Sequence, residues 1–115
     1  MRIIGRRVRV GRRDELDLVG WDGDTLVFVE VKTRANETFG RPAAAVNTAK
    51  RRYLSRAALR YVQRRFPRHP PQFIRFDVVE VVGTPEGARP EVRHLKDVFP
   101  LQGSYRYPGS QPRRF

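Results

Sequence analysis

The chain contains no cysteine and only two histidines, His69 and His94, among its 115 residues. The lack of cysteine excludes disulfides, thiolate metal sites and cysteine nucleophiles. One histidine lies in a proline-rich segment and the other in a predicted strand, which excludes a zinc site built on several imidazoles. Any metal site must therefore use oxygen ligands, which suit Mg²⁺ or Mn²⁺.

Long hydrophobic runs are also absent. No apolar segment approaches the roughly 20 residues that span a bilayer, and the basic N-terminal segment lacks the apolar stretch of a signal peptide. We therefore expect a cytoplasmic protein without a membrane partner. The length predicts a single domain, assigned to residues 1–99. The remaining residues, 100–115, are rich in Pro, Gly and Ser and are expected to form a disordered or loosely attached tail.

Acidic residues are scarce beside basic ones. The chain has 12 Asp and Glu against 24 Lys and Arg, a net charge of +12, and only Lys32, Lys50 and Lys96 are lysines. No acid occurs in residues 1–13, which hold six arginines. The planar guanidinium group suits phosphate oxygens, so this excess favours a polyanionic partner such as nucleic acid. The alternative is an arginine-rich genome of high GC content.

The hydrophobic pattern predicts strands, then one helix, then further strands. Asn47 or Thr48 can cap a helix over residues 48–65, whose apolar residues recur along one stripe. Alternating or β-branched segments indicate the strands, the first of which is expected at a sheet edge because of its charge. These strands are predicted at residues 3–10, 15–21, 25–33, 73–83 and 91–96. This order implies an α/β or α+β fold, a sheet with a helix packed on it.

The second and third predicted strands form a hairpin that carries charges at the end far from its turn. A two-residue turn at 23–24 sets Asp17 opposite Glu30, whereas a turn one residue earlier sets Glu15 opposite Glu30. Because side chains alternate along a strand, both registers place these carboxylates and Lys32 on one face. The sequence leaves the register open.

The third strand reads "LVFVEVKTR" from Leu26. Alternation puts Val27, Val29 and Val31 on one face, which we expect to build the core. The opposite face then begins apolar, with Phe28, and ends charged. Strands that are apolar on both faces lie in the centre of a sheet.

Carboxylates opposed across a strand pair repel each other unless something offsets their charge. A divalent cation held by Asp17 and Glu30 would turn that repulsion into coordination. Lys32 could then orient a water molecule or neutralise a phosphate. The alternative is a surface ion-pair cluster, worth about 0 to 1 kcal/mol. The patterning favours the metal site.

The order of these residues resembles the PD-(D/E)XK nuclease superfamily, in which an aspartate and a Glu-x-Lys triplet lie on such a hairpin ahead of a helix. Asp17 is followed after twelve residues by Glu30, Val31 and Lys32. Nearly the whole chain, from Arg2 to about Phe99, resembles the YraN family of bacterial proteins, which is related in fold to archaeal Holliday junction resolvases. The segments that carry this resemblance are "DELDLVGWDGDTLVFVEVKTR", "FGRPAAAV", "KRRYL" and "RFDVV".

The resemblance implies a restriction endonuclease-like α/β fold, a mixed sheet flanked by helices. It also implies a site in which Asp17, Glu30 and the Val31 carbonyl bind Mg²⁺ or Mn²⁺ and Lys32 is the catalytic lysine. Glu15 would be an accessory residue, and Lys50 would contact nucleic acid.

The chain departs from the family pattern at its start. The family begins with a helix that bears a glutamate, whereas Met1 falls where that helix has already ended. We therefore expect the N-terminal helix to be missing here and the true start codon to lie upstream. The glycine before the family's glutamate is replaced by Asp14 in "RRDELDL", and Arg51 replaces a frequent glutamine.

The predicted helix carries an arginine every four residues, and these side chains form one ridge. A phosphate backbone would offset their mutual repulsion, and a solvated helix face explains the ridge equally well. We assign three of them, with Lys50, to nucleic-acid binding: Arg52, Arg56 and Arg60.

Three functions compete at this point. The first is a Mg²⁺-dependent DNA endonuclease that hydrolyses phosphodiesters, with DNA favoured over RNA. The second is a nucleic-acid-binding module whose catalytic site is incomplete, and the third is an arginine-rich assembly protein. The sequence leaves a homodimer open.

Overall fold

The computed structural model describes residues 1–34, 46–83 and 89–103. Most of the segment "FGRPAAAV" and the tail from residue 104 lie outside the described residues, so the predictions made for them stay predictions. No helix in the described ranges combines the length and the apolar character needed to cross a membrane.

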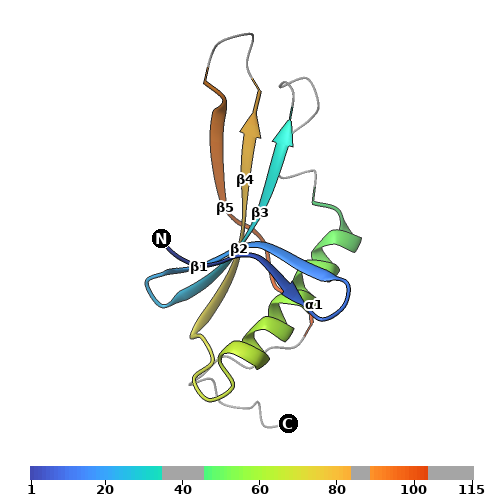
Figure 1. Ribbon diagram of the computed structural model, residues 1–115, viewed down its shortest axis with the longest axis vertical. Helices are drawn as coiled ribbons and strands as arrows, with labels where there is room; N and C mark the ends of the chain where they lie inside the picture. Colours follow the sequence, from blue (N-terminus) through green and yellow to red (C-terminus); the bar gives the residue numbers. More distant parts are fainter. Residues whose placement is uncertain (35–45, 84–88, 104–115) are drawn as a thin grey trace.

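Five strands form one mixed sheet whose order in space follows the order in the chain (Figure 1). The strands are β1 (Arg2–Val10), β2 (Asp14–Asp22), β3 (Thr25–Arg34), β4 (Phe73–Val82) and β5 (Glu91–Phe99), with α1 (Thr48–Arg65) between β3 and β4. Neighbouring strands are antiparallel except β3 and β4, whose arrowheads point to the same end of the sheet in Figure 1. The fold is α/β and compatible with a restriction endonuclease-like fold, and β1 lies at an edge, as predicted.

The β2–β3 hairpin adopts one of the two registers that the sequence allowed. Leu18 pairs with Val29 and Asp22 with Thr25, which places the two-residue turn at 23–24. Gly23 has a positive φ of 59°, a backbone conformation that favours glycine. Away from the turn, the ladder between β2 and β3 ends at the pair of Leu18 and Val29. Asp17, the next residue away from the turn, therefore lies just beyond the regular pairing.

Helix α1 spans the predicted residues 48–65 and is capped by Asn47, whose Oδ1 accepts a hydrogen bond of 2.8 Å from the Lys50 amide. The helix packs on β1 and β2, and its buried side chains join those of the sheet in one core. Ser55 is buried on the same stripe at 1% exposure, a position that the apolar pattern did not predict. Its Oγ accepts a hydrogen bond of 2.9 Å from the Gln102 amide and so fixes the chain after β5.

Strand β3 is covered on both faces at its centre, but its two faces differ from the prediction. The core that packs with α1 contains Leu26 and Phe28, the residues that share a face with Glu30. Val27 and Val29 are buried on the opposite face, and Val31 is 37% exposed. The expectation that Val31 builds the core was therefore wrong, because it lies near the strand end where β2 no longer pairs with β3.

Candidate functional site

The carboxylate of Asp17 is held by the backbone of the neighbouring strand. Its Oδ2 accepts a hydrogen bond of 2.9 Å from the Val31 amide, in the gap where the β2–β3 ladder has ended. Asp17 and Val31 also line a hollow of ≈ 290 Å³ together with Leu18 and two arginines of β1, Arg6 and Arg7. This contact joins two of the predicted metal ligands, Asp17 and residue 31, through one hydrogen bond.

Glu30 has a different partner on the α1 side of the sheet. Its Oε1 lies 3.2 Å from the Nζ of Lys50, in the first turn of α1. The Glu30 side chain is 13% exposed and that of Lys50 is 38% exposed, so the pair is open to solvent mainly through the lysine. Lys50, assigned from the sequence to nucleic acid, thus also compensates the charge of a candidate catalytic carboxylate.

Tyr53 connects this pair to strand β2. Its hydroxyl accepts a hydrogen bond of 2.7 Å from the Glu15 amide and donates one of 3.3 Å to the Glu15 carbonyl. The cationic groups of Lys50 and Arg56 lie 4.8 and 5.5 Å from the centre of its ring. The structure therefore ties Glu15 to the site through its backbone, while the carboxylate of Glu15 belongs to an exposed residue.

Lys32 lies beside a second glutamate on the neighbouring strand. In the parallel β3–β4 ladder Lys32 is paired in register with Glu80, and Glu30 with Val78. Glu80 is 2% exposed and therefore buried. Glu80 could not be predicted as a neighbour of Lys32 from the sequence, because the parallel register that brings them together is set by the α1 crossover.

Two of the predicted nucleic-acid-binding arginines meet a buried aspartate. Asp14, 2% exposed, accepts hydrogen bonds from Arg56 Nε at 3.2 Å and Arg56 Nη2 at 3.1 Å. Arg60 Nη1 lies 3.6 Å from the same carboxylate. The Arg56 hydrogen bond lowers the pKa of Asp14 against the opposing effect of burial. The third predicted arginine, Arg52, lines a hollow further along α1 with Arg56 and Arg60.

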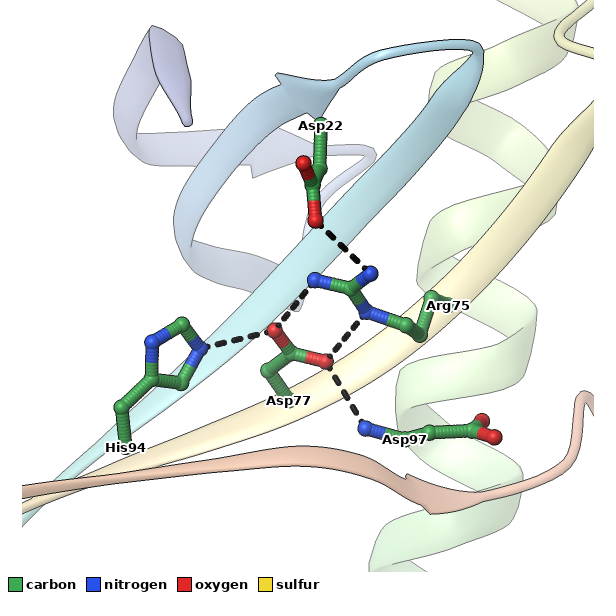
Figure 2. Close-up of polar contacts among 5 residues, drawn as sticks. All are labelled: Asp22, Arg75, Asp77, His94 and Asp97. Carbon is green, nitrogen blue, oxygen red and sulfur yellow. Dashed lines mark hydrogen bonds and ion pairs between the residues drawn. The ribbon is translucent and has the colours of Figure 1, made fainter.

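A separate polar cluster lies on the face of the sheet opposite α1 (Figure 2). The carboxylate of Asp77 is fully buried and accepts hydrogen bonds from Arg75 at 2.8 and 3.0 Å and from the Asp97 amide at 3.0 Å. His94 Nε2 lies 2.8 Å from Asp77, and Arg75 also binds Asp22 at 2.9 Å. Burial alone would raise the pKa of Asp77, but these hydrogen bonds outweigh it and the pKa is lowered. We assign this cluster to the architecture of the sheet.

Two observations concern the predicted metal site: the kind of ligands it would offer and the number of ligands nearby. Two carboxylates and one backbone carbonyl are a fitting donor set for Mg²⁺, which commonly binds one or two carboxylates and keeps several waters. Across residues 1–34, 46–83 and 89–103, no group of three or more His, Cys, Asp or Glu side chains is arranged to hold a metal. A metal here would therefore rest on Asp17, Glu30 and the Val31 carbonyl.

Comparison with known proteins gives a consistent family. The profile of the uncharacterised protein family UPF0102 matches residues 1–81. A UPF0102 protein of Symbiobacterium thermophilum is 48% identical over 98 residues, which are 85% of this chain and 80% of that protein. One of Nocardia farcinica is 48% identical over 99 residues, 86% of this chain and 75% of that protein. One of Geotalea daltonii is 45% identical over 87 residues, 76% of this chain and 66% of that protein.

Proposed function

The chain belongs to the uncharacterised protein family UPF0102, and we propose that it is a nucleic-acid-binding, nuclease-like protein that hydrolyses phosphodiesters of DNA with Mg²⁺ or Mn²⁺. The observation that carries this proposal is the hydrogen bond of 2.9 Å between Asp17 Oδ2 and the Val31 amide. This hydrogen bond holds the Asp17 carboxylate beside Val31, the residue between Glu30 and Lys32.

Asp17, Glu30 and the Val31 carbonyl would hold the cation. A bound Mg²⁺ would supply the positive charge that activates water and offsets the charge of the phosphate. The Val31 amide orients the Asp17 carboxylate beside the Val31 backbone, which supports its proposed role as a ligand. Glu30 would exchange its contact with Lys50 for one with the cation.

The two lysines supply the remaining charge. Lys32 follows Glu30 on the same face of β3 by strand alternation and would neutralise a non-bridging phosphate oxygen or orient the attacking water. Lys50 Nζ, 38% exposed beside Glu30, would contact the adjacent phosphate. DNA is favoured over RNA through the resemblance of the hairpin to that of DNA-cleaving PD-(D/E)XK enzymes.

The test is cleavage of plasmid and branched DNA by the purified chain in Mg²⁺. Asp17→Asn and Glu30→Gln are each expected to lower the rate by about 100-fold or more, because each removes a charged ligand of the proposed cation. Lys32→Ala is expected to lower it to a similar extent, because it removes the cation that would offset the charge of the phosphate. Glu91→Gln is the control, since Glu91 is an exposed acid that pairs with Arg93 on β5. Retention of full Mg²⁺-dependent cleavage by both carboxylate variants would refute the proposal.

A second candidate is a nucleic-acid-binding module without catalysis. The ion pair between Lys50 and Glu30 favours it, because Lys50 already compensates the charge that a metal would otherwise neutralise. This candidate predicts salt-dependent binding by wild type and no turnover at any Mg²⁺ or Mn²⁺ concentration. Cleavage that is lost in Glu30→Gln would rule it out.

A further inference from the structure

A basic hollow lies between the turn that joins β1 to β2 and the exposed face of α1. It measures ≈ 820 Å³, and five arginines line it against one aspartate. These residues are Arg12, Arg13, Asp14, Arg56, Arg60 and Arg64. The turn contributes two arginines that are far in sequence from the helix, so the hollow is a product of the fold.

Two of the arginines, Arg56 and Arg60, are held by the buried carboxylate of Asp14. Asp14 lies at the base of the hollow, binds Arg56 through two hydrogen bonds and lies 3.6 Å from Arg60. Arg56 and Arg60 nevertheless stay 54% and 48% exposed. Because a guanidinium has five N–H donors and Asp14 engages two of those of Arg56, the other three remain available to a ligand. The arginines are therefore ordered before any anion arrives, which reduces the entropic cost of binding.

Gly11 lines the hollow and lies close to the Arg60 guanidinium. Its φ is +78°, and a Cβ placed there would come within 2.8 Å of Arg60 Nη1. Any side chain at this position would therefore displace the Arg60 guanidinium. The glycine both forms the turn and leaves room for the arginine.

The remaining arginines of the hollow have no anionic partner among the described residues. Arg12, Arg13 and Arg64 are exposed, and none forms an ion pair within the part of the chain that the structure describes. A second hollow shares Arg56 and Arg60 and continues along α1 to Arg52. From residue 52 to residue 64 the helix rises about 18 Å, so the basic surface is elongated and suits a chain of phosphates better than a single one.

We propose that this hollow binds successive backbone phosphates of a nucleic-acid strand that runs along α1 toward Lys50 and Glu30. The inference rests on the proposed function and adds the residues that position the strand. Arg12, Arg13 and Arg64 contact the phosphates, and Asp14 positions Arg56 and Arg60. Arginine contacts of this kind fix the register of a strand without reading its sequence.

The first test compares two single arginine changes that remove the same charge. Arg64→Gln lies in the hollow, whereas Arg68→Gln lies outside it in the exposed connector after α1. Binding of a fluorescein-labelled DNA duplex is measured in EDTA, so that cleavage does not interfere, over a series of salt concentrations. Arg64→Gln is expected to weaken binding about 5-fold and to reduce the slope of log K against log salt by about 1, with no change in slope for Arg68→Gln.

The second test alters the shape of the hollow at constant charge. Gly11→Ala and Gly23→Ala both place a side chain at positive φ, but a Cβ at Gly23 meets nothing within 4 Å. Only Gly11→Ala is expected to weaken DNA binding, and thermal melts identify any general loss of folding. If the two arginine variants weakened binding equally, and the two glycine variants did so too, the proposed role of the hollow would be refuted. The proposed function would then still stand. No DNA binding by wild type would overturn both.

Discussion

At the scale of single residues, Asp77 brings together three polar partners in the described sheet. It is fully buried and satisfies Arg75, His94 and the amide of Asp97 (Figure 2). Each partner would be left with an unmet hydrogen bond or charge if the carboxylate were lost, and burial makes such losses costly. Asp77 is therefore expected to be important for stability.

Asp77→Asn is expected to lower the free energy of unfolding by about 3 kcal/mol, because it leaves the charge of Arg75 without its buried partner. The matched control is Asp22→Asn, which removes the other carboxylate bound to Arg75 but from a side chain that is 43% exposed. The loss in the control should be much smaller. Chemical denaturation at neutral pH measures the free energy of unfolding of both variants. Equal losses of stability would contradict the importance of the buried Asp77 carboxylate.

The same substitution should change the response to acid. The pKa of Asp77 is lowered from its ordinary value of 3.8, so its stabilising contribution is present above that value and is lost as the pH falls through the lower, folded pKa. The stability of the Asn variant should therefore depend less on pH below about 4 than that of wild type.

Some functional residues could be predicted from the sequence, but their contacts across the fold could not. Asp17, Glu30 and Lys32 could be selected because their charges interrupt an apolar alternation. The pairing of Glu30 with Lys50 could not, because it depends on where the first turn of α1 docks on the sheet. Asp14 was identified only as a departure from the family pattern, although it is the buried anchor of Arg56.

At the scale of elements, α1 is the part that the sequence predicts best. Its bounds coincide with the predicted residues 48–65 because a capping residue precedes the apolar stripe and Pro67 follows its end. Strand β5 extends to Phe99, beyond the predicted residue 96. The extension contains an irregularity in register between Leu95 and Phe99, which breaks the alternation on which strand prediction depends.

The helix cap offers a direct test at this scale. Asn47→Ala should lower the free energy of unfolding by about 1 kcal/mol, because the Lys50 amide loses the acceptor that lies at 2.8 Å. Asn47→Asp is the control, since an aspartate caps a helix equally well. Urea denaturation of the three proteins distinguishes them, and equal midpoints for wild type and the Ala variant would contradict the cap.

At the scale of the whole molecule, charge and topology act together. A net charge of +12 predicts attraction to polyanions, but composition alone does not say where they bind. The proposed binding place is a product of the fold, because the antiparallel β1–β2 turn and the later α1 bring five arginines to one hollow. The sequence could predict the strand order only in outline, since the parallel β3–β4 pair depends on the crossover of α1.

Binding of the whole protein to DNA should therefore be steeply salt-dependent. If all five arginines of the hollow each contact a phosphate, the slope of log K against log salt is expected to be about −4.5 for duplex DNA, since about 0.9 counterions are released per contact. Fluorescence anisotropy over a salt series measures the slope. An affinity that does not change with salt would contradict phosphate binding by this protein.

Both edge strands of the sheet, β1 and β5, are irregular. In β1 the register shifts between Ile3 and Gly5, and Arg7 has a positive φ of 47°. In β5 the shift opposite Asp77 leaves Asp97 at a φ of 54°, and the Asp97 amide is already used by the Asp77 carboxylate. A straight, unpaired edge recruits strands from other molecules, whereas bulges and edge charges discourage such pairing. We therefore expect the hydrogen bond that completes the buried Asp77 cluster to discourage edge-to-edge aggregation as well.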